Sequence, residues 1–595
     1  MERERGLVRA QTERFDVVVI GGGVTGTGVA LDAASRGLSV CLVEKRDFAS
    51  GTSSRSSKLI HGGLRYLEQR DFGLVREALR ERRVLIEDIA PHLVRPAPFL
   101  LPLRHHVWER TYIGAGVLLY DLLAGRHAAV PHHRHLSRKQ CLAIAPSLSR
   151  DALVGGIEYH DAQIDDARHT LVVARTAASE GALCLSGLAV ERVLVERGAA
   201  AGVEVTDREA PGSAPFAIRG DVVVNATGVW TTLVEELAGV TNPLRVRASK
   251  GIHIVVPRHR VRSETAVILR TEKSVLFLIP WGDRWVIGTT DTDWTYDLDH
   301  PAASSTDIDY VLRWANSVLT DKLVRDDVVG VYAGLRPLIS GGATATTKLS
   351  REHAINVSMP KLVSIAGGKY TTYRLMAVDA VDAAGRELGR TIPRSRTHEI
   401  PLLGADGHTN AAVRLRSHAG AASLPADALV HLVARYGSTA SEVLDLIAEH
   451  PALAESLPTE PCAVGRVSEP SGDVAVDPDA FDSAHRRFRD GGRYLTAEAV
   501  HAARYEGARH VDDVLTRRTR LSIEADDRGV GAAAAVAEAI GAELGWDAAT
   551  AARETAHYLE RVAAERHAET MPDDARADAV RSPVRDARLI GGHRR

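Results

Sequence analysis

The sequence predicts an α/β protein in which a Rossmann-like dinucleotide-binding domain carries an inserted mixed or antiparallel-sheet domain and precedes a C-terminal all-α domain. Three observations predict this architecture. A buried strand, a glycine turn and a helix open the chain, alternating apolar strands fill residues 236–350, and alanine-rich helical periodicity follows a linker at 396–412. The chain has 595 residues, more than one hydrophobic core usually supports.

Composition limits the possible functions. The chain is 45% hydrophobic and 25% charged, as in a soluble globular protein, and its net charge of -3 with dispersed cations argues against nucleic-acid binding. The four cysteines form no CxxC pair, which favours a reduced compartment, and the histidine clusters lack metal-ligand spacing, so no metal site is predicted. Because no signal peptide or run of about 18 apolar residues appears, we expect a cytoplasmic protein without a spanning helix.

The first element, FDVVVI at 15–20, predicts a buried parallel strand. It enters a turn in which Gly21, Gly23 and Gly26 fit GxGxxG, followed by a helix and a second strand that ends at Glu44. Gly21 allows a tight turn, Gly23 lets a pyrophosphate approach the backbone, and Gly26 lets the helix pack on the strand. Glu44 can accept hydrogen bonds from ribose hydroxyls. The whole order predicts one bound dinucleotide, either FAD or NAD.

The pattern of a later strand favours one of these two cofactors. Residues 221–230, DVVVNATGVW, form a buried strand pattern that ends in a small-residue turn at Gly228. The pattern resembles the turn that closes over the FAD pyrophosphate and ribityl chain in flavoproteins of the two-dinucleotide-binding-domain type, although other Thr-Gly turns look similar. Together with the N-terminal fingerprint it favours non-covalent FAD.

Six segments of the chain match segments of one protein family and occur in the same order as in that family. They are TSSRSSKLIHGGLRYLE at 52–68, NATGVW at 225–230, SKGIHIVVP at 249–257, IPWGDRWVIGTTD at 279–291, AGLRPL at 333–338 and AGGKYTTYR at 366–374. Over about residues 15–545 the chain resembles the FAD-dependent, respiratory sn-glycerol-3-phosphate dehydrogenases. The resemblance implies oxidation of sn-glycerol 3-phosphate to dihydroxyacetone phosphate by hydride transfer to FAD N5, with electrons passed to a membrane quinone.

The resemblance also implies the cofactor contacts. Hydroxyl and ammonium groups would hold the pyrophosphate and the isoalloxazine edge, and glycines would keep side chains away from the ring. The residues implied, besides the GxGxxG glycines and Glu44, are Thr52, Ser53, Ser54, Ser57, Lys58, Gly62, Gly228, Gly367, Thr371 and Thr372.

A phosphate monoester carries close to two negative charges, so its binding calls for cations. The resemblance places Arg336 and Arg351 at the active site, where a guanidinium can bind phosphate oxygens in bidentate fashion, and brings Lys369 from the opposite side. The other substrate contacts that it implies are Arg65, Tyr66, Thr289 and Thr290.

Alcohol oxidation also calls for a base that takes the hydroxyl proton. His253 is the preferred candidate because imidazole titrates near neutral pH and its strand is expected to line the pocket. His61, beside the cofactor loop, is the rival, and the choice between them stays open. The predicted catalytic set is His253, Arg336 and Lys369.

The matching segments divide the chain into domains, with residues 66–149 expected to be largely helical. The expected boundaries are 15–64, 150–235 and 351–395 for the FAD-binding domain, 65–149 and 236–350 for the substrate-binding cap, 396–412 for the linker, 413–565 for the C-terminal helical domain and 566–595 for a polar, disordered tail.

Residues 104–127 combine flanking cations, Trp108 and Tyr112 with a short apolar stretch that Asp121 interrupts. This pattern suits a helix lying in a membrane interface, although core packing explains it nearly as well. With the family's quinone acceptor, it predicts a peripheral protein on the inner face of the cytoplasmic membrane. A homodimer is a further expectation that the sequence leaves open.

One departure and three rival functions remain. Val229 stands where the family commonly has proline, which could loosen the dimethylbenzene end of the flavin. A glycerol-3-phosphate oxidase that uses oxygen and releases hydrogen peroxide would keep the same residues. A non-catalytic flavin-bearing scaffold would leave the cations idle, and an amine or amino-acid oxidase would have no use for them.

Overall fold

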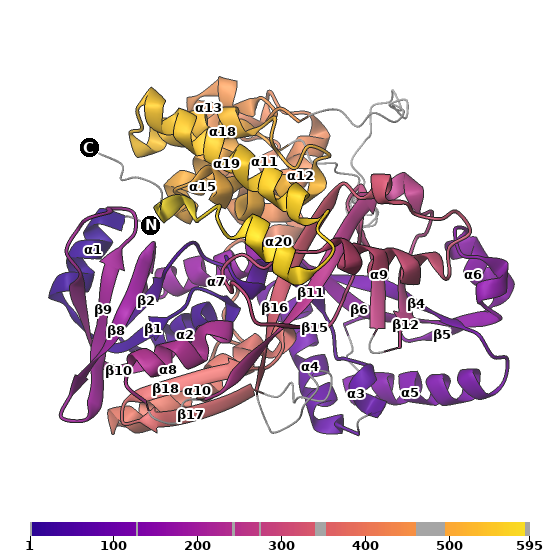
Figure 1. Ribbon diagram of the computed structural model, residues 1–595, viewed down its shortest axis with the longest axis horizontal. Coiled ribbons are helices and arrows are strands. Elements are labelled where there is room, and N and C mark those ends of the chain that lie inside the picture. The colour runs from indigo at the N-terminus through magenta and orange to yellow at the C-terminus, as the bar shows by residue number, and fades with distance from the viewer. Residues whose placement is uncertain are drawn as a thin grey trace.

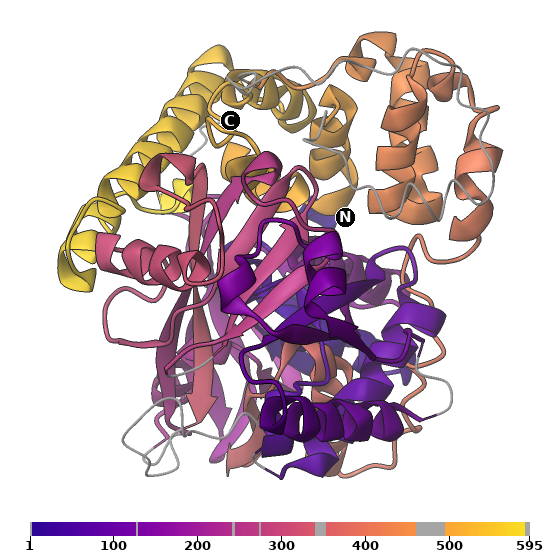
Figure 2. The same cartoon turned by 90° about the vertical axis from the view of Figure 1, so that its right-hand side faces the viewer.

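The computed structural model describes residues 3–589 apart from residue 69 and residues 126–128, 241–243, 273–274, 340–352 and 460–493. Two β-sheets lie side by side, and the C-terminal helices lie across one end of both (Figure 1). Seen from a second direction, these helices, coloured orange to yellow, again form a separate layer at that end (Figure 2).

Eight strands in the described part of the chain form the first sheet, in the order β17–β18–β10–β1–β2–β7, with β9 beside β10 and β8 beside β9. They are β1 (Arg14–Ile20), β2 (Val40–Glu44), β7 (Leu183–Ser186), β8 (Leu188–Glu196), β9 (Ala199–Asp207), β10 (Phe216–Asn225), β17 (His353–Met359) and β18 (Leu362–Gly367). The pairs from β18 through β10, β1 and β2 to β7 are parallel, which confirms the predicted α/β fold.

Strand β1 is buried on both faces, as its uninterrupted apolar run predicts. Val17 and Val19 belong to the core beneath helix α2 (Val24–Ser35), whereas Val18 and Ile20 belong to the core on the opposite face. Helices α7 (Asp166–Ser179) and α10 (Tyr373–Leu388) flank α2 on the first face. The polar segment before β1 forms helix α1 (Arg3–Thr12), which covers the second face.

The second sheet is mixed and, within the described residues, has ten strands in the order β15–β11–β14–β13–β12–β4–β6–β3, with β16 beside β11 and β5 beside β6. They are β3 (Leu59–Ile60), β4 (Val94–Leu103), β5 (Arg134–Ser137), β6 (Gly155–Ile164), β11 (Val246–Pro257), β12 (Ala266–Arg270), β13 (Val275–Trp281), β14 (Arg284–Gly288), β15 (Thr292–Trp294) and β16 (Gly330–Ile339). Most neighbours are antiparallel, and β4 with β12 is a parallel pair.

This pairing changes the expected organisation. Residues 66–149 are mostly helical, as expected, but the ten-residue strand β4 also runs through them. The expected FAD-binding piece 150–235 begins with β6, a strand of the second sheet. An apolar run of this length can form a strand in either sheet. The sheet to which it belongs depends on the strand with which it forms hydrogen bonds.

Helices surround the second sheet, and the C-terminal part of the described chain is helical, as predicted. Around the second sheet lie α3 (Arg65–Glu68), α4 (Phe72–Val84), α5 (Trp108–Ala124), α6 (Arg138–Ile144) and α9 (Ser305–Asn316), and α8 (Thr231–Leu237) follows β10. The C-terminal helices are α11 (Ala411–Leu415), α12 (Ala426–Tyr436), α13 (Ala440–Glu449), α15 (Thr496–Glu506), α16 (Val511–Asp513), α17 (Leu521–Glu524), α18 (Ala533–Leu544), α19 (Ala548–Ala568) and α20 (Asp574–Arg581). No helix of the described chain is long and apolar enough to cross a membrane.

The predicted disordered tail at 566–595 is wrong for the residues that the structure describes. Helix α20 forms, and Asp574 at its start makes a salt bridge of 2.5 Å with the buried Lys250 of β11. Arg588 is 4% exposed and binds Glu209 and Asp513. The composition of this segment is polar, as in a disordered tail, but its charges are neutralised by partners far away in the sequence.

Candidate active site

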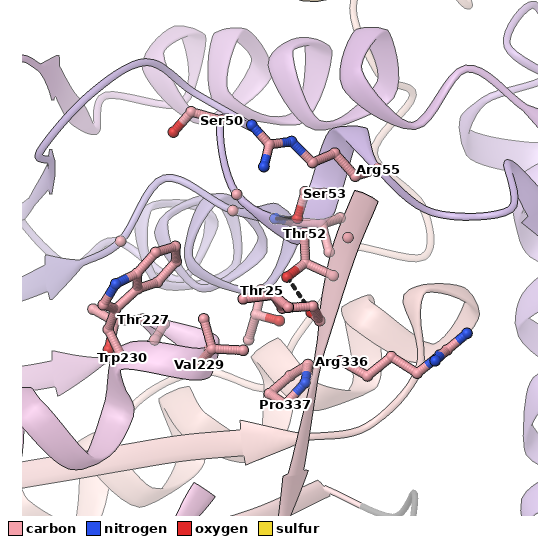
Figure 3. A pocket seen from close by; sticks show the side chains of 18 of the residues that line it. Thr25, Ser50, Thr52, Ser53, Arg55, Thr227, Val229, Trp230, Arg336 and Pro337 are labelled. Carbon is pink, nitrogen blue, oxygen red and sulfur yellow. Dashed lines mark hydrogen bonds between the residues drawn. The ribbon is translucent and has the colours of Figure 1, made fainter. Parts of the chain in front are cut away.

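A cavity of about 500 Å³ lies between the two sheets. Its walls come from the turn after β1, the loop after β2, the turn after β10, strands β11 and β16, and the segment after β18. Figure 3 shows part of this lining, including the loop residues Thr52 and Ser53, Thr227 and Trp230 from the turn after β10, and Arg336 and Pro337 from β16. The six sequence segments with the family's order therefore contribute to one cavity.

The glycine turn after β1 has the geometry that the sequence predicts. Gly21 has φ of +109°, and a Cβ there would lie 2.8 Å from the carbonyl oxygen of Ala226. A Cβ at Gly26 would lie 1.9 Å from the carbonyl oxygen of Gly21, so the start of α2 can approach β1 only with glycine. Gly21 and Gly23 line the cavity, whereas Gly26 lies behind them and serves this packing.

The adenosine end is marked by Glu44 at the end of β2. One carboxylate oxygen of Glu44 accepts a hydrogen bond of 2.7 Å from Gly22 N, and the other accepts one of 2.8 Å from Arg46 N. Because a carboxylate can accept about four hydrogen bonds, capacity remains for ribose hydroxyls. The Ser53 hydroxyl accepts from Val24 N at 2.9 Å, so it binds the first turn of α2.

The serine-rich loop, residues 50–58, joins the two sheets across this cavity. The Thr52 hydroxyl donates to the carbonyl oxygen of Leu335 on β16, at 2.6 Å (Figure 3). The Ser57 hydroxyl lies 2.9 Å from Nε2 of His253 on β11. Thr52, Ser53 and Ser57 line the cavity, whereas Ser54 does not, and its carbonyl oxygen instead accepts from Lys58 and Arg520.

Two predicted cofactor contacts have other roles in the structure. Lys58 is fully buried outside the cavity lining, and its ammonium forms a salt bridge of 2.8 Å with Asp166. Burial and the nearby Arg520 lower the pKa of Lys58. Gly62 packs against α5, since a Cβ there would lie 2.6 Å from the Tyr120 hydroxyl, and its amide donates to the same oxygen at 2.8 Å. Neither residue lines the cavity.

His253 and Arg336 both line the cavity from neighbouring strands. His253 is 2% exposed, its ring stacks on Tyr332 with centroids 4.8 Å apart, and burial together with the charges of Arg336 and Lys58 holds its pKa well below the ordinary value. The imidazole is therefore neutral near pH 7. His61 also lines the cavity, so the structure keeps both candidate bases.

The Arg336 guanidinium is oriented by strand-end oxygens. It donates to the Thr289 hydroxyl at 3.2 Å and to the carbonyl oxygen of Thr290 at 3.1 Å. Thr289 lines the cavity, but the Thr290 hydroxyl points into the sheet and accepts from Ile252 N at 3.1 Å. Of the predicted pair, Thr289 is thus the one placed to meet a ligand.

Of the three remaining predicted cations, the structure describes the side chain of Lys369 alone. Lys369 lines the cavity, and its ammonium lies 3.7 Å from the ring centroid of Tyr66, which also lines it. Arg65 is the first residue of α3, with no description of its side chain, and Arg351 lies outside the described residues.

Of the remaining predicted cofactor contacts, the two glycines line the cavity and the two threonines lie behind its wall. Gly228 and Gly367 line the cavity and have positive φ, +61° and +78°. Thr371 lies behind the wall, where its hydroxyl accepts from His61 N at 3.1 Å and donates to the carbonyl oxygen of His61 at 3.2 Å. Thr372 is buried outside the lining as well.

Sequence reasoning missed a cationic wall on the other side of the serine-rich loop. Lys45, Arg46 and Arg55 line the cavity, and the Lys45 ammonium lies 4.3 Å from the ring centroid of Trp230. The basic pair directly after Glu44 was a visible signal. Val229, where the family commonly has proline, packs against Trp294 and Leu335.

Comparisons with known proteins agree with this geometry. A family model described as "FAD dependent oxidoreductase" matches residues 16–374, and one described as "C-terminal domain of alpha-glycerophosphate oxidase" matches residues 395–551. The chain is 51% identical over 581 residues to glycerol-3-phosphate dehydrogenase 2 of Mycobacterium tuberculosis, with 98% of this chain and 93% of that protein covered. It is 49% identical over 587 residues to glycerol-3-phosphate dehydrogenase of Mycobacterium leprae, with 99% and 94% covered.

A solved structure supports the same assignment. The X-ray structure of glycerol-3-phosphate dehydrogenase from Bacillus halodurans complexed with FAD superimposes with a TM-score of 0.71 at 28% identity, covering 94% of this chain and 96% of that one. Matches of this extent reach both sheets and the C-terminal helices. The chain therefore belongs to the family of FAD-dependent glycerol-3-phosphate dehydrogenases.

Proposed function

We propose that this protein oxidises sn-glycerol 3-phosphate to dihydroxyacetone phosphate with bound FAD and passes the electrons to a membrane quinone. The observation that carries the proposal is the convergence of His253, Arg336 and Lys369 on the cavity that the glycine turn opens. The named activity of the relatives supports the same reaction.

The residues present fit FAD. Gly21 has no Cβ, which at this position would collide with the backbone of Ala226. The start of α2 offers backbone amides to a pyrophosphate. Glu44 retains acceptor capacity for ribose hydroxyls at one end of the cavity, while Gly228 and Gly367 leave room elsewhere in its wall. When bound, FAD supplies a two-electron acceptor for hydride.

Arg336 and Lys369 supply the charge that a phosphate monoester requires. The hydrogen bonds from Arg336 to Thr289 and Thr290 hold its guanidinium on the cavity wall before a ligand arrives. Preorganised donors lose little side-chain entropy when the substrate binds. We expect these two cations to determine substrate affinity.

His253 then takes the proton of the substrate hydroxyl at a ring nitrogen. Its depressed pKa keeps the imidazole free to accept a proton, and the Ser57 hydroxyl, 2.9 Å away, orients the ring. Tyr332, stacked on the ring, restricts its plane. His61 is the alternative base in the same cavity.

The test is anaerobic mixing of the yellow holoenzyme with sn-glycerol 3-phosphate while the flavin band near 450 nm, typical of oxidised flavins, is followed. We expect bleaching in the native protein and bleaching slowed by about 10²- to 10⁴-fold in His253→Gln, with His61→Gln affected less. Flavin that stays oxidised in excess substrate would refute the reaction and favour a scaffold. The opposite order of the two variants would make His61 the base.

The electron acceptor is tested by reoxidation of the bleached enzyme. A quinone analogue should restore the band at once, and air only slowly. Rapid reoxidation by air with release of hydrogen peroxide would favour an oxidase, the activity named in the C-terminal family model.

Helix α5 supports the membrane side of the proposal. Its outer face carries Trp108, Tyr112, Leu118 and Leu122, each at least half exposed, while Ile113, Val117 and Tyr120 pack inward. The spacing places the exposed apolar residues along one stripe, next to the exposed Arg104, His105 and His106. We propose that this face lies on an anionic lipid surface at the cytoplasmic side, at the end of the protein opposite the C-terminal helices (Figures 1 and 2).

Sedimentation with vesicles of anionic phospholipid tests this contact. Native protein should sediment with the vesicles, and Leu122→Asp combined with Trp108→Ala should remain in the supernatant, because the apolar stripe is lost. Leu559→Asp, an exposed leucine on α19, is the matched control and should behave as native protein. Equal binding of all three would remove α5 from the proposal. The homodimer stays a prediction for analytical ultracentrifugation.

A further inference from the structure

A second, smaller cavity lies where the serine-rich loop meets the C-terminal helices. It measures about 70 Å³, and its lining includes Arg55, His300, Arg561 and Arg581. A neighbouring cavity of about 20 Å³ shares these four residues and adds Arg46. Arginines from the serine-rich loop, α19 and the end of α20 thus surround one space.

Arg55 differs from the other arginines there. Among the described residues its guanidinium has no hydrogen bond or salt bridge, whereas Arg561 pairs with Asp512 at 2.8 Å and with Glu565 at 2.9 Å. Figure 3 shows the Arg55 side chain extending toward Ser50, away from Thr52. Its charge therefore enters the cavity region without a carboxylate within salt-bridge distance, and the more distant Glu565 offsets only part of it.

Glu565 and Glu569 also line the cavity, but they pair with Arg561 and Arg528, which leaves the region around Arg55 positive. Arg46 donates to the carbonyl oxygen of Asp299 at 2.9 Å, and Arg581 donates to the carbonyl oxygen of Val584 at 3.0 Å, with Glu565 more distant at 3.6 Å. Burial and the charges of Arg46, Arg561 and Arg581 lower the pKa of Arg55 to about 9. A half-buried cation beside other cations is destabilised by their repulsion, and an anion in the cavity would offset that repulsion.

We propose that this arginine cavity is a binding site for a small tetrahedral dianion of the phosphate class, held by Arg55 and Arg581. Its volume of about 70 Å³ is several times the 10–15 Å³ that one water needs by the same measure, so a phosphate group fits. Guanidinium groups bind such oxygens in bidentate fashion. Because Arg581 donates to Nδ1 of His300 at 3.3 Å, the neutral imidazole carries its proton on Nε2 and can add a donor.

Arg55 also lines the active-site cavity, but at a different place from the proposed substrate site. Figure 3 shows the guanidinium groups of Arg55 and Arg336 pointing away from each other, on different sides of the serine-rich loop. A bound dianion would join that loop to α19 and α20. Its occupation would therefore stabilise the C-terminal helices against the part of the chain that lines the cofactor cavity.

The test is calorimetric titration of the FAD-loaded protein with inorganic phosphate at constant ionic strength. Phosphate also mimics the substrate's phosphate, so the native protein should bind two ions. Arg336→Met should keep the arginine-cavity ion, whereas Arg55→Met should lose it or bind it at least tenfold more weakly, with Arg55→Lys between them. Native stoichiometry and affinity in Arg55→Met would overturn the proposal.

Thermal unfolding gives an independent readout that a misfolded variant could not imitate. Without phosphate, Arg55→Met should unfold at a higher temperature than native protein, because one of several cations that repel one another is gone. With phosphate, native protein should gain stability and the variant should not. Loss of the flavin band from Arg55→Met would instead assign the guanidinium to the cofactor and refute the site.

A parallel titration with methyl phosphate identifies the source of the dianion. Binding of methyl phosphate to Arg336→Met would point to phosphorylated metabolites, and binding of inorganic phosphate alone would point to the free ion. Either result supports the site. Arg581→Met is a second variant and should weaken the same binding event; if it leaves that event unchanged, Arg581 is not a ligand and the assignment fails.

Discussion

At the scale of single residues, the pairing of charges decides which cations face the active-site cavity. Lys58 and Arg336 both look like ligands for an anion in the sequence. Lys58 is fully buried and its ammonium lies 2.8 Å from Asp166, since a buried ammonium must be closely paired. Arg336 lies farther from its carboxylate partner, 3.6 Å from Asp291, is also held by hydroxyl and carbonyl oxygens, and reaches the cavity. The same residue type thus acts as a structural partner in one place and as a proposed ligand in the other.

Replacing Arg336 should weaken substrate capture. In Arg336→Met we expect kcat/KM for sn-glycerol 3-phosphate to fall about 10²- to 10³-fold, since hydrogen bonds to charged groups contribute about 1.5–3 kcal/mol each. Arg336→Lys should recover part of the loss, because the charge remains without the planar fork. The rate of flavin bleaching at varied substrate concentration measures both.

The control for this prediction is Arg192→Met. Arg192 is an exposed arginine of β8 that pairs with Glu204 at 2.8 Å, and its loss should leave the kinetics as they are. An Arg336→Met enzyme with unchanged kcat/KM would remove this arginine from the substrate site.

At the scale of elements, short turns and ion pairs set how helices and strands join. The GxGxxG turn joins β1 to α2 as the sequence predicts, because its geometry depends on residues close together in the chain. The contact between the first sheet and the C-terminal helices depends instead on His510, whose ring lies between Glu209, just after β9, and Glu554 of α19. Those residues are far apart in sequence.

His510 should make stability fall at alkaline pH. The two carboxylates raise the pKa of His510 to about 10, against about 6.5 for an unfolded histidine. Below pH 6.5 both states are protonated and the contribution is complete, and as pH rises through 10 the native state also loses the proton and the contribution disappears. Urea unfolding of native protein and His510→Gln should show a difference in unfolding free energy that shrinks between about pH 6.5 and 10. A difference that stays constant with pH would contradict the charged pair.

At the scale of the whole molecule, buried salt bridges join the C-terminal helices to the segments around the active-site cavity. Asp47, fully buried just after β2, accepts from Arg517 at 2.5 Å and from Arg518 at 2.7 Å and 2.8 Å. Arg520 adds a contact to Asp166, which also holds Ser56. The C-terminal part thus positions the serine-rich loop.

Removing Asp47 should destabilise the entire protein. Asp47→Asn leaves two guanidinium groups short of a buried partner, and we expect a loss of about 3–5 kcal/mol in unfolding free energy. Asp221→Asn is the matched control, because its pair with Arg14 is exposed and contributes less than about 1 kcal/mol. Chemical unfolding of the holoproteins measures both, and equal losses would show that the buried contact with Asp47 is not what couples the regions.

The sequence by itself determined the Rossmann-like unit, the cofactor class and the family, because these depend on local order: a strand, glycines at fixed spacing, an acid, and short segments around the cavity. It also predicted His253, Arg336, Lys369 and Thr289, which line the cavity. Tertiary structure alone decided the places of Lys58, Gly62, Thr290 and β6, the ordered helix α20, and the unpaired charge of Arg55. Apart from Arg55, whose guanidinium has no hydrogen-bond partner among the described residues, each of these depends on a partner far away in the sequence, such as Asp166 for Lys58. Charge compensation and strand pairing leave no local pattern in the chain.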